Sequence, residues 1–156
     1  MTEPRPFEIL VVCTGNTCRS PLAAAALGRA IEQANLGNVR VSSAGTGAWE
    51  GAPASEGSYL VALEAGLDLS AHRARPLTEE LVDGADLILA MSRSHLARAR
   101  ELGGRDRAHL FAEFAGAGEG VEVADPFGSD LEEYRRTLRE LEEMTPGIMA
   151  RLPKTV

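Results

Sequence analysis

A short apolar run that leads straight into a cysteine-containing loop is the feature that most constrains the fold of this chain. Residues 9–12 read Ile-Leu-Val-Val. A continuous run of this kind, rich in β-branched residues, is typical of a strand buried on both faces of a parallel sheet. Pro21 favours the first turn of a helix, because its missing N–H would be unpaired there anyway. The segment predicts a strand, a loop from Cys13 to Arg19, and a helix.

The loop between this strand and helix has the composition of an anion-binding site. Gly15 and Asn16 are the residue types that most easily adopt left-handed dihedral angles, which turn backbone N–H groups toward a common point. The N-terminus of the following helix adds free N–H groups and partial positive charge. Arg19 adds a planar guanidinium that can bind two phosphoryl oxygens at once. We therefore expect the loop to bind a phosphoryl group.

Cys13 stands at the mouth of this site, where a thiol can act as a nucleophile. A helix N-terminus and a neighbouring Arg both stabilise a thiolate, so Cys13 needs no histidine base. Ser20 can donate a hydrogen bond to this thiolate. The alternative is a buried structural cysteine with Arg19 as a surface charge. The order of strand, Cys, Gly-Asn, Arg, Ser-Pro and helix favours the nucleophile.

Composition and charge fit a single domain over residues 1–156. A chain of this length can bury one sizeable core, and its net charge of −7 with no basic stripe argues against a nucleic-acid partner. No apolar run approaches the ~20 residues that cross a membrane, so we expect no membrane partner. Residues 1–6 lack a hydrophobic signal core, which predicts a cytoplasmic protein. Two cysteines in such a chain indicate thiol chemistry rather than a disulfide framework.

The sequence motifs for nucleotide and metal binding are absent. The chain has neither the Gly-Lys-Ser/Thr ending of a nucleoside triphosphatase loop nor G-x-G-x-x-G. Cys13 and Cys18 have no second Cys or His cluster with which to complete a zinc site, because His72, His95 and His109 are scattered. We expect no metal and no other cofactor, and we interpret His95 and His109 as structural.

Strand and helix patterns alternate along the chain. Strands are predicted over 39–43, 87–91 and 109–114, and the Gly-rich segment 44–53 is interpreted as a loop. Helices are predicted between these strands: one ends before Asn35, one spans 55–65, one spans 78–82, and one runs from a Ser92 cap through Leu102. The helix over 55–65 is expected to have Leu60, Ala62 and Leu63 on its apolar side. A last helix is predicted to begin at the capping-box pattern Ser129-x-x-Glu132 and to break or kink at Pro146.

This βαβ order predicts a single-domain, Rossmann-like α/β fold, a four-stranded parallel sheet with helices on both faces. Ligands of such sheets bind beyond the carboxyl ends of the strands. Cys13 lies at such an end.

The run from Val12 to Pro21, Val-Cys-Thr-Gly-Asn-Thr-Cys-Arg-Ser-Pro, resembles the signature of the low-molecular-weight protein tyrosine phosphatases, whose Cys-x5-Arg-Ser loop opens the chain. Further matches lie at 43–45, 72–78, 85–91 and 125–128. The resemblance implies covalent catalysis by Cys13 with Arg19, on phosphorylated protein substrates. It implies a phosphate-binding loop that contains Thr14, Gly15, Asn16, Thr17, Cys18 and Ser20.

Asp125 is the candidate for the second catalytic group, a general acid. A basic leaving group on phosphorus needs a proton in the transition state, and a positioned carboxylic acid can supply it. Asp125 precedes Pro126 in a Gly-rich loop and matches the general acid of the family's Asp-Pro loop. The alternative is a simple Asp-Pro turn. The presence of the Cys13 loop favours the catalytic role.

The resemblance also implies a buried polar network that supports the loop. Its members map to Asn16, Ser20, Ser43 and His72. His72 has an ordinary alternative, because a lone histidine is often a satisfied polar residue with no further role. For Cys18 two interpretations stay open. As the resemblance implies, it can form a reversible disulfide that protects Cys13 from overoxidation, or it is a small residue facing the core.

The residues expected to form the substrate pocket favour two different substrates. Thr17 stands where most tyrosine-specific members carry Ile, and together with Asp-Pro-Phe-Gly and Pro76–Leu81 it resembles the bacterial protein-arginine phosphatases. Trp49 stands where tyrosine-specific members keep an aromatic wall, although a single aromatic residue in a Gly-rich segment can also merely pack its own loop. Phe127 is expected to form the other wall. We favour phosphoarginine over phosphotyrosine as the substrate.

Two other functions on the same fold are less consistent with the sequence. An arsenate reductase needs further cysteines to carry electrons away, and this chain has none beyond Cys18. A catalytically silent phosphoprotein-binding module typically loses its nucleophile or its acid, whereas Cys13, Arg19 and Asp125 are all present. A protein phosphatase is therefore the favoured function.

Overall fold

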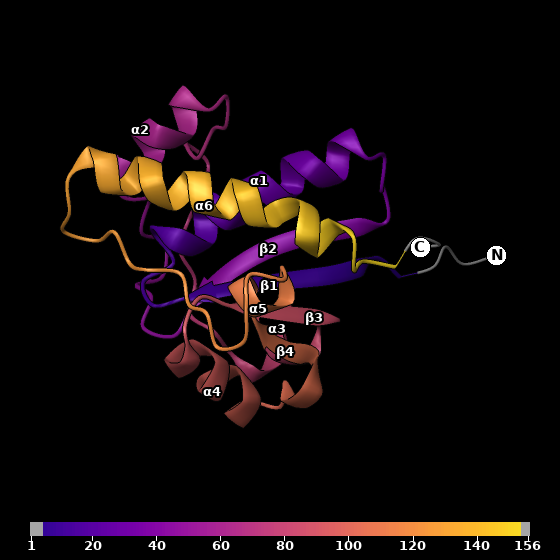
Figure 1. Cartoon of the computed structure of the whole chain (residues 1–156). Helices are drawn as coiled ribbons and strands as arrows, with labels where there is room; N and C mark the ends of the chain where they lie inside the picture. The colour runs from indigo at the N-terminus through magenta and orange to yellow at the C-terminus, as the bar shows by residue number, and fades with distance from the viewer. Residues whose placement is uncertain (1–4, 154–156) are drawn as a thin grey trace.

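The computed structural model describes residues 5–153, and a sheet of four parallel strands lies at its centre (Figure 1). The strands are β1 (Phe7–Cys13), β2 (Val39–Gly45), β3 (Leu87–Ala90) and β4 (Ala108–Leu110), in the order β2-β1-β3-β4. This is the predicted Rossmann-like sheet. The expectations for a domain over 1–156 and for no signal core over 1–6 include residues 1–4 and 154–156, which lie outside the described residues.

β1 is one of the two inner strands of the sheet and carries the site. Because the chain crosses from β1 to β2 on one side and then returns to β3 on the other, the carboxyl end of β1 is the topological switch point where ligands of such sheets bind. The apolar run predicted as a doubly buried strand is indeed buried on both faces: Ile9 and Val11 face one apolar cluster, and Leu10 and Val12 face another. Cys13 is the last residue of β1.

Helices cover both faces of the sheet, as predicted. On the larger cluster lie α1 (Arg19–Gln33) and α6 (Leu131–Met149), which pack against each other, with α2 (Glu56–Glu64) beside α6. The opposite face carries α3 (Glu79–Asp83) and α4 (Arg93–Glu101), and α4 is seen below the sheet in Figure 1. Short helical turns η1 (Arg105–Arg107) and α5 (Phe111–Phe114) flank β4. Within 5–153, no helix combines the length and apolar character needed to cross a bilayer.

The predicted strand over 109–114 is wrong from residue 111 onward. β4 ends at Leu110, and residues 111–114 form the helical turn α5. Phe111 and Phe114 are both buried in the larger cluster. Residues three apart lie on the same side of a helix but on opposite faces of a strand, so burying both rings together requires the helical turn.

The last helix differs from the prediction at both ends. Its N-cap is Asp130, whose side chain accepts a hydrogen bond from the Glu133 N–H, rather than Ser129. The helix also continues through Pro146 to Met149 instead of breaking there. Ile148, fully buried in the larger cluster, holds this last turn against the core. Packing thereby outweighs the single backbone hydrogen bond that proline removes.

α2 has a different buried face from the one predicted. Ser55 caps it by accepting a hydrogen bond from the Ser58 N–H. Ser58, Val61 and Ala62 are buried, at the i, i+3, i+4 spacing of one helix face, whereas Leu60 and Leu63 are exposed. The expectation that both leucines face the core is therefore wrong.

Candidate active site

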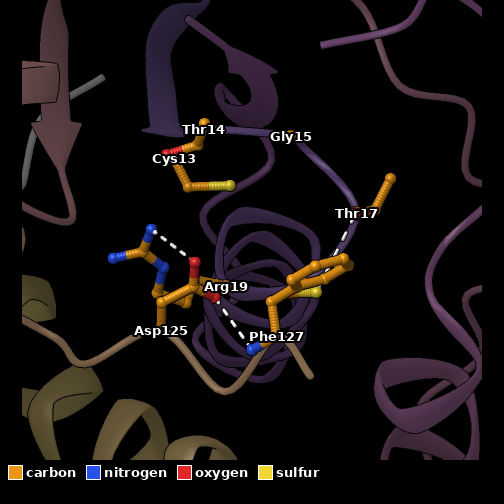
Figure 2. Close-up of a pocket in the computed structure, with 8 residues that line it drawn as sticks. Cys13, Thr14, Gly15, Thr17, Arg19, Asp125 and Phe127 are labelled. Carbon is orange, nitrogen blue, oxygen red and sulfur yellow. Dashed lines mark hydrogen bonds and ion pairs between the residues drawn. The ribbon is translucent and has the colours of Figure 1, made fainter. Parts of the chain in front are cut away.

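A cavity of about 200 Å³ opens at the carboxyl end of β1, over the N-terminus of α1 (Figure 2). The structure brings into its lining most of the predicted site residues, which come from the loop after β1, the start of α1 and the segment before α6: Cys13, Thr14, Gly15, Thr17, Cys18, Arg19, Asp125 and Phe127. A volume below the roughly 300–1,000 Å³ of sites for drug-sized ligands suits a single side chain and its phosphoryl group.

Cys13 is held by a hydrogen bond from the predicted partner. Its Sγ lies 2.9 Å from Ser20 Oγ, and Ser20 Oγ in turn accepts a hydrogen bond of 2.8 Å from Asn16 Nδ2. Because the Asn16 amide fills the acceptor side of the Ser20 hydroxyl, the hydroxyl hydrogen is free to point at the sulfur. This series of hydrogen bonds can stabilise a thiolate at Cys13.

Asn16 fixes the shape of the loop through every polar group of its side chain. Its φ of 57° is in the left-handed region, as expected, whereas Gly15 does not have a positive φ, contrary to the expectation. Asn16 Nδ2 also donates to Ser43 Oγ at 2.9 Å, and Asn16 Oδ1 accepts from the Arg75 N–H at 3.0 Å. Asn16 is fully buried, so these bonds stabilise a backbone conformation that an L-residue rarely adopts.

His72 completes this network from the other side of the loop. Its Nε2 donates to the backbone carbonyl of Asn16 at 2.6 Å, since a carbonyl oxygen can only accept. Burial, followed by the charges of Arg73 and Arg75, lowers the pKa of His72. The four residues expected to support the loop, Asn16, Ser20, Ser43 and His72, are therefore in hydrogen-bond contact through Asn16.

Arg19 links the loop to the segment that carries Asp125. It is 5% exposed, and its Nη1 donates to the carbonyl of Val123 at 2.9 Å, while Nη2 lies 3.6 Å from Asp125 Oδ2. Val123 is itself held by a backbone hydrogen bond to Met91, just past the end of β3. The guanidinium thus has a fixed orientation at the cavity, and Asp125 lies beside it (Figure 2).

Asp125 and Phe127 form the side of the cavity opposite the end of β1. Asp125 Oδ1 accepts a hydrogen bond from the Phe127 N–H at 3.0 Å, which fixes the turn, and about half of the Asp125 side chain remains accessible to solvent. The Phe127 ring is 73% exposed yet lines the cavity, as expected for a wall that a bound side chain would cover.

Trp49 does not form the second wall. It is 84% exposed and does not belong to the cavity lining, which contradicts the expectation from the sequence. Its loop is held through backbone hydrogen bonds, from Gly51 to Ala74 and from Ala74 to Ala52, rather than by packing of the indole ring. The side chain therefore projects into solvent, and the alternative that it packs its own loop is excluded as well.

Cys18 lines the cavity and, like Cys13, has a free thiol. Its Sγ donates to Ser55 Oγ at 3.3 Å and is 3.7 Å from Tyr134 Oη. Cys18 is buried in the larger cluster, which agrees with a small residue that faces the core. The reversible disulfide with Cys13 stays a prediction.

Two residues at the site were missed by sequence reasoning. His95, interpreted as structural, contacts Thr14 Oγ1 at 2.7 Å through its Nε2. Gly45 packs so closely under the loop that a Cβ there would overlap the carbonyl oxygen of Thr14 and lie 2.9 Å from Asn16 N. The match to the family at residues 43–45, Ser-Ala-Gly, could have indicated Gly45. His95 lies 81 residues from its partner, and nothing local in the sequence indicates the pairing.

Comparisons with known proteins agree with this site. The family model described as low molecular weight phosphotyrosine protein phosphatase matches residues 8–156. The protein-arginine-phosphatase of Geobacillus stearothermophilus is 40% identical over 149 residues, which cover 94% of this chain and 97% of that protein. EpsP of Ralstonia nicotianae, named a probable low molecular weight protein-tyrosine-phosphatase, is 39% identical over 147 residues, 94% of each chain.

A solved structure extends the similarity to the fold and the reaction. The YwlE arginine phosphatase, in a variant whose active-site cysteine is replaced by a phosphorylated serine, aligns with a TM-score of 0.89 and 37% identity over 96% of this chain and 97% of that one. In that protein the residue that replaces the cysteine carries the phosphoryl group. This chain belongs to the low molecular weight phosphotyrosine protein phosphatase family, whose members are cysteine-dependent protein phosphatases.

Proposed function

We propose that this protein removes the phosphoryl group from phosphoarginine side chains of proteins, through a cysteinyl-phosphate on Cys13. The observation that carries the choice of substrate is that Thr17 lines the cavity, at a position where an aliphatic residue would favour a phenol ring. The catalytic roles below rest on the contacts of Cys13, Arg19 and Asp125 described above.

In the first step, the Cys13 thiolate attacks phosphorus and the P–N bond breaks. Arg19 and the backbone N–H groups of the loop hold the equatorial oxygens, where negative charge gathers in the transition state. The departing guanidine nitrogen takes a proton from the Asp125 carboxylic acid, which lies at the solvent-accessible side of the cavity. A neutral arginine side chain leaves and then takes its usual proton from water.

In the second step, water attacks the phosphorus of the cysteinyl-phosphate. Asp125, now a carboxylate, accepts a proton from this water, so that the same group acts as base after acting as acid. The P–S bond breaks, and the Ser20 hydroxyl stabilises the thiolate that departs, at the 2.9 Å contact already present. Inorganic phosphate is released and Cys13 returns to its starting state.

Thr17 supports phosphoarginine because of what each substrate offers at the pocket. A guanidine carries N–H donors next to the P–N bond, and the Thr17 hydroxyl can accept one of them. A phenol ring offers only C–H groups there, so it would give that hydroxyl no partner beyond Cys18 Sγ, which lies 3.8 Å away. Phe127 does not discriminate, because both a planar guanidine and a phenol ring can stack on its face.

Phosphotyrosine is the second candidate substrate. It is favoured by EpsP, whose identity to this chain is almost the same as that of the arginine phosphatase. Trp49 is the residue of this chain that most favoured phosphotyrosine in the sequence, and its side chain is exposed and does not line the cavity.

The test compares kcat/KM on one peptide sequence that carries either phosphoarginine or phosphotyrosine. Thr17→Val removes the hydroxyl at nearly constant volume, and Thr17→Ile also adds bulk. We expect wild type to prefer phosphoarginine and both variants to lose about tenfold or more of that preference, the effect of one unpaired polar group. Faster hydrolysis of phosphotyrosine by wild type would contradict the proposal.

A further inference from the structure

His95 forms a bridge between α4 and the loop that follows Cys13. It lies in the first turn of α4, and its side chain is 2% exposed. Nε2 contacts Thr14 Oγ1 at 2.7 Å, and Nδ1 contacts Ser92 Oγ at 2.9 Å and the Ser92 backbone nitrogen at 3.2 Å. Both ring nitrogens of a buried imidazole thus have partners, one at the helix end and one in the phosphate loop.

The partners of the ring determine where its proton lies. The Ser92 backbone N–H can only donate, so Nδ1 accepts, and the neutral ring carries its hydrogen on Nε2. Nε2 therefore donates to Thr14 Oγ1. Burial, and after it the positive charge of Arg19, lowers the pKa of His95 to about 4, so this neutral tautomer is the form present at neutral pH.

Thr14 is well placed to transmit this contact to the reaction. It directly follows the nucleophile, lines the cavity, and its carbonyl accepts a hydrogen bond from the Gly47 N–H at 2.9 Å. With one lone pair of its hydroxyl occupied by His95, the side chain is fixed and its hydroxyl hydrogen remains free to be donated. A fixed Thr14 fixes the loop next to the sulfur.

We propose that His95 is a positioning residue of the phosphatase reaction: by donating from Nε2 to Thr14 Oγ1, it aligns the phosphate loop with the transition state. It touches neither substrate nor the reacting atoms. The inference rests on the proposed phosphatase function, and holds equally for phosphoarginine and phosphotyrosine, since the contact acts on the phosphoryl group.

The expected consequence is a selective loss of transition-state binding. Without the His95 bond, Thr14 gains rotamer freedom and the loop holds the five-coordinate phosphorus less well, while the ground-state substrate is held much as before. His95→Ala should lower kcat about tenfold or more with little change in KM, the effect of about one lost hydrogen bond. Inhibition by vanadate, which mimics the transition state, should weaken by a similar factor, whereas inhibition by inorganic phosphate should not.

Three further variants separate positioning from folding. His95→Gln places an amide N–H where Nε2 lies and can still accept from the Ser92 N–H, so it should restore most of kcat. Thr14→Val removes the acceptor and should lower kcat as His95→Ala does. The double variant should be no slower than either single one, because both remove the same contact. His109→Gln is the matched control, because His109 lies on β4, packs against Phe114 of α5 and does not line the cavity. The kcat of this variant should be unchanged.

The assay uses the full-length chain with p-nitrophenyl phosphate, at a temperature where thermal unfolding shows each variant folded. Unchanged kcat in folded His95→Ala, or additive losses in the double variant, would overturn the inference. A kcat that falls in His95→Ala and is not restored by His95→Gln, with unchanged vanadate inhibition, would also overturn it. If wild type hydrolyses neither p-nitrophenyl phosphate nor any phosphopeptide, the proposed function itself fails, which is a distinguishable result.

Discussion

Ser20 Oγ lies 2.9 Å from Cys13 Sγ and accepts a hydrogen bond from Asn16, so the nucleophile ends a buried chain of hydrogen bonds. Ser20→Ala removes the donor to the thiolate, which is the nucleophile of the first step and the leaving group of the second. We expect kcat to fall about 10- to 100-fold, since a hydrogen bond to a charged group contributes roughly 1.5–3 kcal/mol. Steady-state and burst kinetics measure this.

The second step should be affected more than the first, so phosphoenzyme should accumulate and the burst should become more distinct. Ser70→Ala, on an exposed loop residue, is the control and should behave as wild type. An unchanged kcat in Ser20→Ala would show that the contact has no catalytic role.

Gly45 at the end of β2 is predicted to tolerate no side chain. A Cβ there would overlap the Thr14 carbonyl oxygen and approach Asn16 N to 2.9 Å, and both are backbone atoms of the loop that cannot move independently. Gly45→Ala should destabilise the fold by about 1–3 kcal/mol, as overpacking does, and should lower kcat/KM further by displacing the loop. Gly37→Ala meets nothing within 4 Å and is the matched control. Equal urea midpoints and activities for the two variants would contradict the prediction.

Asp125→Asn should slow the reaction in proportion to the basicity of the leaving group. A guanidine or an alkoxide needs the proton that Asp125 supplies, whereas p-nitrophenolate departs readily without it. We expect the rate of phosphoenzyme formation to fall about 10²- to 10⁴-fold on phosphoarginine and much less on p-nitrophenyl phosphate. Single-turnover kinetics with both substrates measure this. Equal losses on the two substrates would indicate that Asp125 serves another purpose, such as orienting Arg19 at 3.6 Å.

Stability should fall as pH decreases, in part because of His95. Burial and Arg19 lower its pKa to about 4 against the opposing charges of Asp125 and Glu122, while the unfolded chain titrates near the ordinary 6.5. Between these values the unfolded state binds more protons, so stability is lost as pH falls from about 6.5 to about 4.

Between pH 7 and pH 4.5 the contribution of His95 should be on the order of 2 kcal/mol, less than the full shift because pH 4.5 is still above the folded-state pKa of about 4. Urea unfolding of wild type and His95→Gln at pH 7 and pH 4.5 isolates this contribution, because His72 titrates in both proteins. The variant should lose less stability on acidification. An identical pH dependence would contradict the assignment.

The sequence predicted the sheet and the loop well because their signals are local. The run Ile-Leu-Val-Val and the Asn16 turn specify their own backbone conformations, and both are found as predicted. The errors arose where tertiary packing decides between local alternatives. Phe111 and Phe114 form a helical turn because burying both rings on one side requires it, and Pro146 stays within α6 because Ile148 is buried.

At the site, sequence reasoning found the residues that belong to a recognisable motif and missed those whose partners are distant in the sequence. The Asn16 network follows from a resemblance, and its hydrogen bonds are present. The His95 contact depends on how α4 is placed beside the end of β1, which no local pattern records. The direction of the Trp49 side chain depends on backbone bonds between two distant loops, so the residue type alone led to the wrong position.

The most direct test asks whether phosphate from phosphoarginine passes through Cys13. Ser20→Ala, in which the cysteinyl-phosphate should accumulate, is mixed with a phosphoarginine peptide and quenched during turnover, and the peptide that contains Cys13 is analysed by mass spectrometry under conditions that preserve the cysteinyl-phosphate. We predict a phosphoryl group on Cys13, and no turnover by Cys13→Ser. An unmodified Cys13 peptide during active turnover, or sustained release of phosphate by Cys13→Ser, would contradict the covalent route.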